Sequence, residues 1–173
     1  MRLIALFFIT FFSFSLTSTA FASDVKFFKN IQGKWTGPGE IVAGKYKGTK
    51  YVCTFDGTNP PNGQGMIIDG SCRVGVFSQK MTAHITKKGN TYKGAFLDGA
   101  KGEGMDVTGG RYTKNRIIVD ILRKQLKGTM VVNLSDQNQM KATISVRHND
   151  KLIPVIGMNL KRIDTSTVTG STN

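Results

Sequence analysis

Apolar and polar residues alternate along most of the chain in short segments, which end at clusters of glycine, asparagine, aspartate and lysine. Near the C-terminus, for example, Met140, Ala142 and Ile144 fall on one face of an extended segment, and polar residues fall on the other. A period of two is typical of strands with one buried and one solvated face. The alternation predicts ten strands, at residues 34–42, 49–55, 65–74, 76–87, 91–97, 102–108, 116–123, 127–135, 139–147 and 152–162.

These short strands and short connections indicate an all-β domain, a single up-and-down antiparallel β-barrel of about 8–10 strands. Closure into a barrel leaves no unpaired strand edge. A β-sandwich of the same strands has the same alternation, so it remains an alternative. Two glycine-rich points are expected to interrupt strands. Gly37-Pro38-Gly39 predicts a kink or bulge in the first strand, and Gly109-Gly110 falls in the connection after the strand at 102–108.

The first 22 residues have the pattern of a secretory signal peptide. Arg2 provides a positive start, residues 3–16 are an apolar run, and Ala20-Phe21-Ala22 is an A-x-A cleavage site. The run is shorter than the about 20 residues that span a bilayer. The sequence therefore predicts cleavage after Ala22 and an exported protein, periplasmic or secreted, without a transmembrane anchor. Residues 164–173 are expected to form a disordered Ser/Thr-rich tail, which leaves residues 23–163 as one barrel domain.

The two cysteines, Cys53 and Cys72, are expected to form a disulfide, because export places this isolated pair in an oxidising compartment. The turn signal between them, at residues 59–63, is centred midway between the two positions. A hairpin that folds at Asn62-Gly63 places the cysteines opposite each other on paired strands, within reach of a disulfide.

The chain is strongly basic, with 24 lysines and arginines against 11 acidic residues and a formal net charge of +13. The basic residues are scattered, with no arginine-rich block and no interleaved aromatic residues, so the sequence does not indicate a nucleic-acid binder. For an exported protein, this charge favours an acidic protein or an acidic envelope surface as the partner. Solubility charge on the outer faces of strands would give the same composition.

The sequence contains no recognisable catalytic, metal-binding or cofactor motif. His84 falls on the polar face of its strand, and His148 lies beside a turn. Neither has cysteine or carboxylate neighbours at the spacing of metal ligands. We therefore expect no catalytic residues, no metal and no cofactor, and a protein that is not an enzyme.

Six methionines lie beyond the signal peptide, roughly one for each strand, and most fall on the predicted inner face. Methionine fills irregular gaps in cores and also lines adaptable binding pockets. A packed core and a hydrophobic ligand cavity therefore both remain possible. The side chains expected to line such a cavity are Met81, Ile85, Met130, Val132, Met140 and Ile144.

The segment Gly33-Lys34-Trp35 follows a short hydrophobic lead-in and resembles the G-x-W start of the lipocalins and the wider calycin group of β-barrels. In those folds the tryptophan plugs one end of the barrel, and a basic residue near the end of the last strand packs over it. The resemblance implies that Trp35 is the plug and that Arg162, or its neighbour Lys161, is the basic partner. It also implies binding of a small apolar ligand.

Small periplasmic metalloprotease inhibitors of bacteria also begin with G-x-W and carry one disulfide across an early hairpin, as Cys53 and Cys72 would. In that family the extended N-terminal residues enter the protease cleft, which implies Ser23, Asp24 and Val25 here. Most of the chain also resembles a broad set of exported proteins of α-proteobacteria. Two functions remain open: lipocalin-like binding of a small apolar ligand or envelope component, and a secreted effector or inhibitor that binds a protein through its N-terminus, loops and basic surface.

Overall fold

The computed structural model describes residues 21–97 and 104–163, which form one helix followed by ten strands. The first 20 residues, which hold most of the predicted signal peptide, and the expected tail at 164–173 lie outside this part of the chain. The elements are α1 Phe21–Asn30, β1 Gly33–Ile41, β2 Lys50–Thr58, β3 Gly65–Val74, β4 Phe77–Lys88, β5 Thr91–Leu97, β6 Met105–Thr113, β7 Arg116–Arg123, β8 Leu126–Leu134, β9 Gln139–His148 and β10 Lys151–Arg162.

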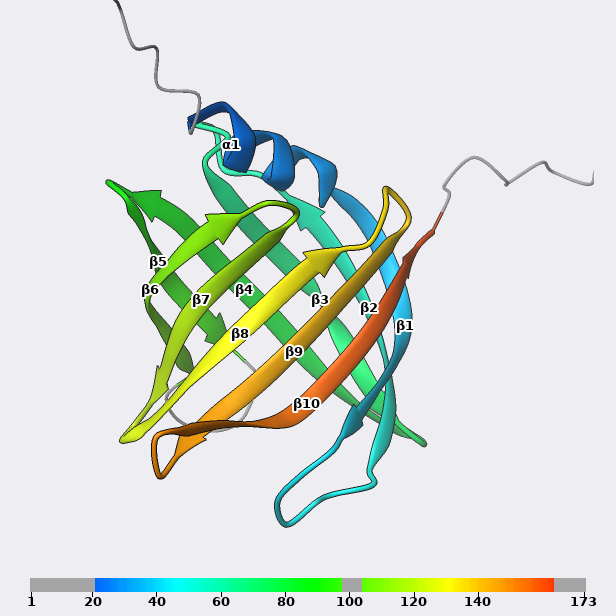
Figure 1. Cartoon of the computed structure of the whole chain (residues 1–173). Helices are drawn as coiled ribbons and strands as arrows, with labels where there is room; N and C mark the ends of the chain where they lie inside the picture. Colours follow the sequence, from blue (N-terminus) through cyan, green and yellow to red (C-terminus); the bar gives the residue numbers. More distant parts are fainter. Residues whose placement is uncertain (1–20, 98–103, 164–173) are drawn as a thin grey trace, which may run out of the picture.

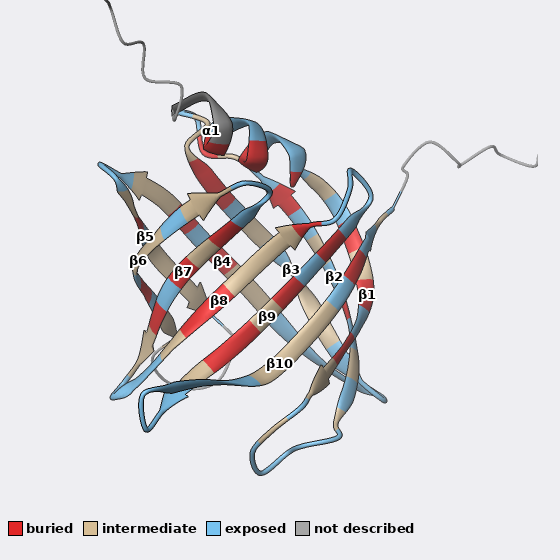
Figure 2. Cartoon of the chain, in the orientation of Figure 1, coloured by how far each residue is buried: buried red, intermediate tan, exposed pale blue. Residues whose placement is uncertain are grey.

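The strands follow one another around a closed barrel in chain order, and β1 pairs with β10 to complete it (Figure 1). Each strand is antiparallel to its neighbours. Buried positions alternate with more exposed ones along β7 and along much of β9, as Figure 2 shows. The up-and-down barrel predicted from the alternation is therefore confirmed, and the sandwich is excluded.

The glycine-rich start of β1 has a different role from the predicted kink or bulge. The register of β1 against β10 is the same before and after Gly37-Pro38-Gly39, although the ladder has no pairs at Gly37 and Pro38. Pro38 has no N–H to donate to the ladder. A Cβ on Gly37 would lie 2.0 Å from the backbone oxygen of Asn159 on β10. Glycine is therefore required for the close approach of the first and last strands.

Gly109-Gly110 lies inside β6, which corrects the prediction that these residues belong to a connection. The register between β6 and β7 shifts between Val107 and Gly109, so the pair marks a β-bulge. Gly110 has a φ of 151°, and a Cβ there would lie 2.5 Å from the backbone oxygen of Ile118. A glycine pair typical of a turn is used here to bend a continuous strand.

The predicted disulfide is present between Cys53 on β2 and Cys72 on β3. The two residues are direct partners in the ladder, with their Cα atoms 4.0 Å apart. Cys53 is fully buried in the barrel wall. The bond joins two strands that are already neighbours in a hairpin, so it restricts the unfolded chain more than it shapes the barrel.

Replacing both cysteines with alanine is expected to lower the free energy of unfolding by roughly 3 kcal/mol, the value for a loop of this length. Urea denaturation followed by the fluorescence of Trp35 measures the change. The wild-type midpoint should fall when a reductant is added, and the midpoint of the double variant should not respond. Equal free energies of unfolding for the two proteins under oxidising conditions would contradict a stabilising bond.

Candidate functional site

The interior of the barrel contains an apolar cavity of about 110 Å³. Its lining includes every methionine of the chain except Met1: Met66, Met81, Met105, Met130, Met140 and Met158. Among the lining side chains, only Thr82 has a hydroxyl group. The indole N–H of Trp35 is donated to the backbone oxygen of Ile31, at 3.0 Å, so it offers no free donor to the cavity. The chemistry of the cavity is therefore that of a hydrocarbon interior.

All six side chains that the alternation assigned to a possible cavity lie around this one cavity. They are Met81 and Ile85 on β4, Met130 and Val132 on β8, and Met140 and Ile144 on β9. The sequence predicts the inner faces of these strands because successive side chains point to opposite sides of a sheet. It does not predict the cavity, because the cavity volume depends on how all ten strands and the helix pack together.

The helix α1 closes one end of the barrel (Figure 1). Phe28 and Ile31 line the cavity, and each is 1% exposed. The ring of Phe28 packs against Tyr92 on β5, with ring centroids 5.7 Å apart, and Phe27 packs against Tyr112 on β6 at 5.5 Å. These contacts bury the apolar face of the helix against the ends of the strands.

Sequence reasoning missed α1 and treated its residues as a lead-in. A signal was available, because Asp24, Phe27, Phe28 and Ile31 recur at the spacing of one helix face. Ten residues are too few for a helix that is stable alone in water. Packing against the barrel end therefore supplies the stability of α1.

A buried carboxylate fastens α1 to the barrel. Asp24 is 3% exposed and accepts hydrogen bonds from the Lys87 ammonium at 2.5 Å and from the Tyr92 hydroxyl at 3.0 Å. Burial raises the pKa of Tyr92, and the hydrogen bond to Asp24 and its charge raise it further. A buried charge is tolerated when it is paired and hydrogen-bonded, as this one is.

The residues predicted as an inhibitory N-terminus do not form an extended arm. Ser23, Asp24 and Val25 all belong to α1. The carboxylate of Asp24 points to the barrel, and Val25 is 36% exposed. The side chain of Ser23 lies outside the described part. Two hydrogen bonds hold Asp24 in place, and this explains why the segment is helical and not free.

The structure brings the predicted plug residues together. The guanidinium carbon of Arg162 lies 4.3 Å from the ring centroid of Trp35, which is 1% exposed. Gly33 has a φ of 100°, and a Cβ there would lie 2.9 Å from an Arg162 nitrogen. Glycine is therefore needed at the first position of G-x-W, because the backbone φ there is positive and because a Cβ would contact the arginine side chain. Lys161, in contrast, is exposed on the outer face.

The same guanidinium donates to three backbone oxygens around the end of α1. They belong to Asn30 at 2.6 Å, Gln32 at 2.5 Å and Gln137 at 2.9 Å. The planar fork of arginine suits several acceptors at once, and its charge is favourable beside the carboxyl end of a helix. Arg162 therefore joins α1, the link to β1 and the β8–β9 turn.

The cavity lies mainly in the half of the barrel next to α1, where Met66 and Leu160 line it near the strand ends. Phe96 and Met105 extend the lining toward the opposite end, at the end of β5 and the start of β6, and both are partly buried. On the helix side the cavity is covered by Phe28, which is almost completely buried.

Within residues 21–97 and 104–163, no three or more histidines, cysteines or acidic residues lie together in a group that could hold a metal ion. His84 and His148 are both exposed, on β4 and at the end of β9. In the same residues, no helix is long and apolar enough to cross a membrane.

No protein-family model and no curated protein sequence matches the chain. Among solved structures, the chain is similar to the crystal structure of Rv2717c from M. tuberculosis, with a TM-score of 0.59 and 10% sequence identity. The match covers 82% of this chain and 98% of that chain. At this identity, the likeness shows that the two chains share the barrel fold.

Replacing Asp24 with asparagine is expected to lower the free energy of unfolding by about 2 kcal/mol, because the buried Lys87 ammonium loses its counter-charge. Asp69→Asn is the matched control. Its carboxylate lies 3.8 Å from Lys80, and both side chains are more than half exposed. That variant should change stability by less than about 0.5 kcal/mol. Equal losses in urea denaturation of the two variants would contradict the role of Asp24.

Tyr51 provides a test at alkaline pH. Its ring lies over Gly39, where a Cβ would be 2.2 Å away, and burial raises the pKa of Tyr51 to about 12. Because the folded pKa lies above the unfolded value, the stability that this difference contributes is present below pH 10 and is lost between pH 10 and 12. Absorbance at 295 nm should show several late-titrating tyrosines in the wild type, because the pKa values of Tyr92 and Tyr112 are raised as well, and Tyr51→Phe should remove one of them. The alkaline loss of unfolding free energy should be shallower in the variant. Loss of a tyrosine that titrates near pH 10 would contradict the assignment.

Proposed function

We propose that this protein is an exported, non-enzymatic binding protein that holds a small apolar ligand inside its barrel. The observation that carries the proposal is the methionine-lined cavity, which has no charged group in its lining. Burial of apolar surface from water contributes about 25 cal/mol per Å², and flexible thioether side chains adapt to ligands of different outline. The lining offers no acid or base that could activate its one hydroxyl group, on Thr82, for a reaction.

The cavity volume limits the class of ligand. At about 110 Å³, it is well below the roughly 300–1,000 Å³ of pockets for drug-sized molecules. One unbranched hydrocarbon chain or one ring suits this volume. A charged or strongly polar head group would remain outside, because burial without hydrogen-bond partners costs several kcal/mol.

An unfilled space of this size is costly in a protein interior. Protein cores are close-packed and leave few voids larger than a water molecule. At about 24 cal/mol per Å³, an empty cavity of this volume costs roughly 2–3 kcal/mol. Apolar cavities of similar size stay dry and take up small hydrocarbons. The cost of the cavity supports a role for it beyond core packing.

Two further observations support export and disfavour the alternative function. The Cys53–Cys72 bond is the form expected in an oxidising compartment. A protein-binding effector or inhibitor that acts through its N-terminus has less support, because Asp24 is occupied in fastening α1.

Methionine methyl groups labelled with ¹³C allow a direct test, since six of them line the cavity. Titration with decanoic acid below its micellar concentration should shift several of these resonances in a saturable manner. Ala142→Leu should weaken this binding at least tenfold, because Ala142 lines the cavity and a larger side chain there occupies space that a ligand needs.

Ala95→Leu is the matched control, because Ala95 lies on β5 beside the lining residue Phe96 but is not itself part of the lining. It should bind decanoic acid as the wild type does. Methionine resonances that do not respond to decanoic acid or to toluene would contradict the proposal. Equal weakening in both variants would show that binding takes place outside the cavity.

A further inference from the structure

The barrel end opposite α1 carries most of the exposed apolar side chains. Of the thirteen large hydrophobic side chains that are exposed in the described residues, ten lie in the connections at that end or within three residues of the strand ends there. They include Tyr46, Val76, Phe77, Leu126, Leu152 and Ile153. Val76 is 89% exposed and Phe77 is 78% exposed, so these side chains are presented to solvent and not folded back into the barrel.

The barrel fold does not require apolar residues at these positions. The strand-to-strand connections at the α1 end have no large aliphatic or aromatic residue: they span residues 59–64, 89–90, 114–115 and 135–138. Turns at both ends of the barrel reverse the direction of the chain, and polar residues with glycine are the usual residues for that. A cluster of exposed apolar residues on one end therefore marks an interaction surface.

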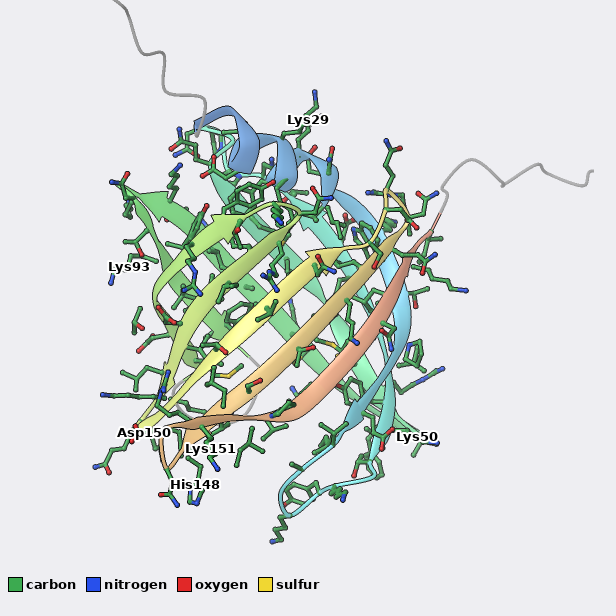
Figure 3. All side chains as sticks on the ribbon, in the orientation of Figure 1. Lys29, Lys50, Lys93, His148, Asp150 and Lys151 are labelled. Atoms are coloured by element: carbon green, nitrogen blue, oxygen red, sulfur yellow. A yellow bond between two sulfur atoms is a disulfide. The ribbon has the colours of Figure 1, made fainter. Side chains whose placement is uncertain are left out.

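Lysines and arginines stand beside the apolar residues at this end. Lys45 and Lys47 flank Tyr46 in the β1–β2 connection, and Lys124 and Lys127 flank Leu126 around the β7–β8 turn. Lys50 and Lys151 also lie at this end, away from Lys29 on the helix (Figure 3). In the β1–β2, β3–β4, β7–β8 and β9–β10 connections, the one acidic residue is Asp150.

We propose that this end of the barrel docks on the surface of a bilayer that contains anionic lipids. The apolar tips of four hairpins enter the boundary between head groups and acyl chains, and the neighbouring lysines contact lipid phosphates. Lysine stems cover apolar surface while their charges stay in water, which suits this boundary. A protein partner fits less well, because lysine is depleted in the core of protein–protein interfaces.

The docking surface and the cavity are separate features, because the cavity lies mainly in the half of the barrel next to α1, where Phe28 and Ile31 line it. Phe96 and Met105 extend the lining toward the docking end, and Leu97, next to Phe96, is 55% exposed. Docking does not itself require a ligand, so the proposal stands or falls separately from the proposed function.

Flotation with vesicles of phosphatidylglycerol and phosphatidylcholine at equal amounts, against pure phosphatidylcholine, tests the proposal. The wild type should bind the anionic vesicles, and binding should weaken with salt because exposed charges are screened. The double variant Val76→Ser/Phe77→Ser should lose at least tenfold in affinity. The matched control is Ile67→Ser/Ile163→Ser, because these residues are 37% and 38% exposed and lie away from this end. It should bind as the wild type does.

Two further measurements distinguish docking of this end from binding inside the barrel and from self-association. In Phe77→Trp, fluorescence should shift to the blue and be quenched by brominated lipids, while the buried Trp35 should not respond. Ala142→Leu should keep wild-type vesicle affinity even where it loses decanoic acid. Equal vesicle affinities for the two double variants would overturn the proposal. So would sedimentation showing a dimer that Val76→Ser/Phe77→Ser abolishes, without vesicle binding by the wild type.

Discussion

The pairing of β1 with β10 is the constraint on which the rest of the structure depends. It converts a meander with two open edges into a closed barrel, and it requires glycine at position 37, where the backbone of β10 approaches. Because the first and last strands pair antiparallel, the start of β1 and the end of β10 meet at one end of the barrel. Trp35 and Arg162 are direct partners in that ladder, so closure itself brings the ring and the guanidinium together.

Two charged side chains then hold α1 over the same end. Asp24 fastens the first turn of the helix, and Arg162 binds the backbone at its last turn. Both charges make several hydrogen bonds, which for the buried Asp24 is the condition for keeping a charge away from water. The two ends of the barrel therefore differ. Aromatic residues and charged contacts close one end under α1, and in the described residues no helix crosses the other end (Figure 1).

The two ends also differ in what lies near them. The methionine-lined cavity lies mainly beside α1, and the hairpin turns at the other end carry exposed apolar side chains beside lysines. In a protein that buried its apolar residues only for stability, neither feature would be needed, since the cavity and the exposed Val76 and Phe77 both cost stability or solubility. The proposed binding of an apolar ligand would give the cavity a use, and the proposed docking on a lipid surface would give the exposed side chains one; both rest on moving hydrocarbon out of water.

The sequence by itself determined the ten strands, their inner faces and the disulfide. These features follow from a side-chain period of two and from pairing between neighbours in the chain, so Cys53 and Cys72 could be matched from one turn. Only the tertiary structure decided the helix, the bulge at Gly109-Gly110 and the cavity. Asp24 is fastened to residues 63 and 68 positions away, and no local pattern encodes such a contact. The cavity is what remains after ten strands close around side chains that do not fill the space, and its volume depends on all of them together.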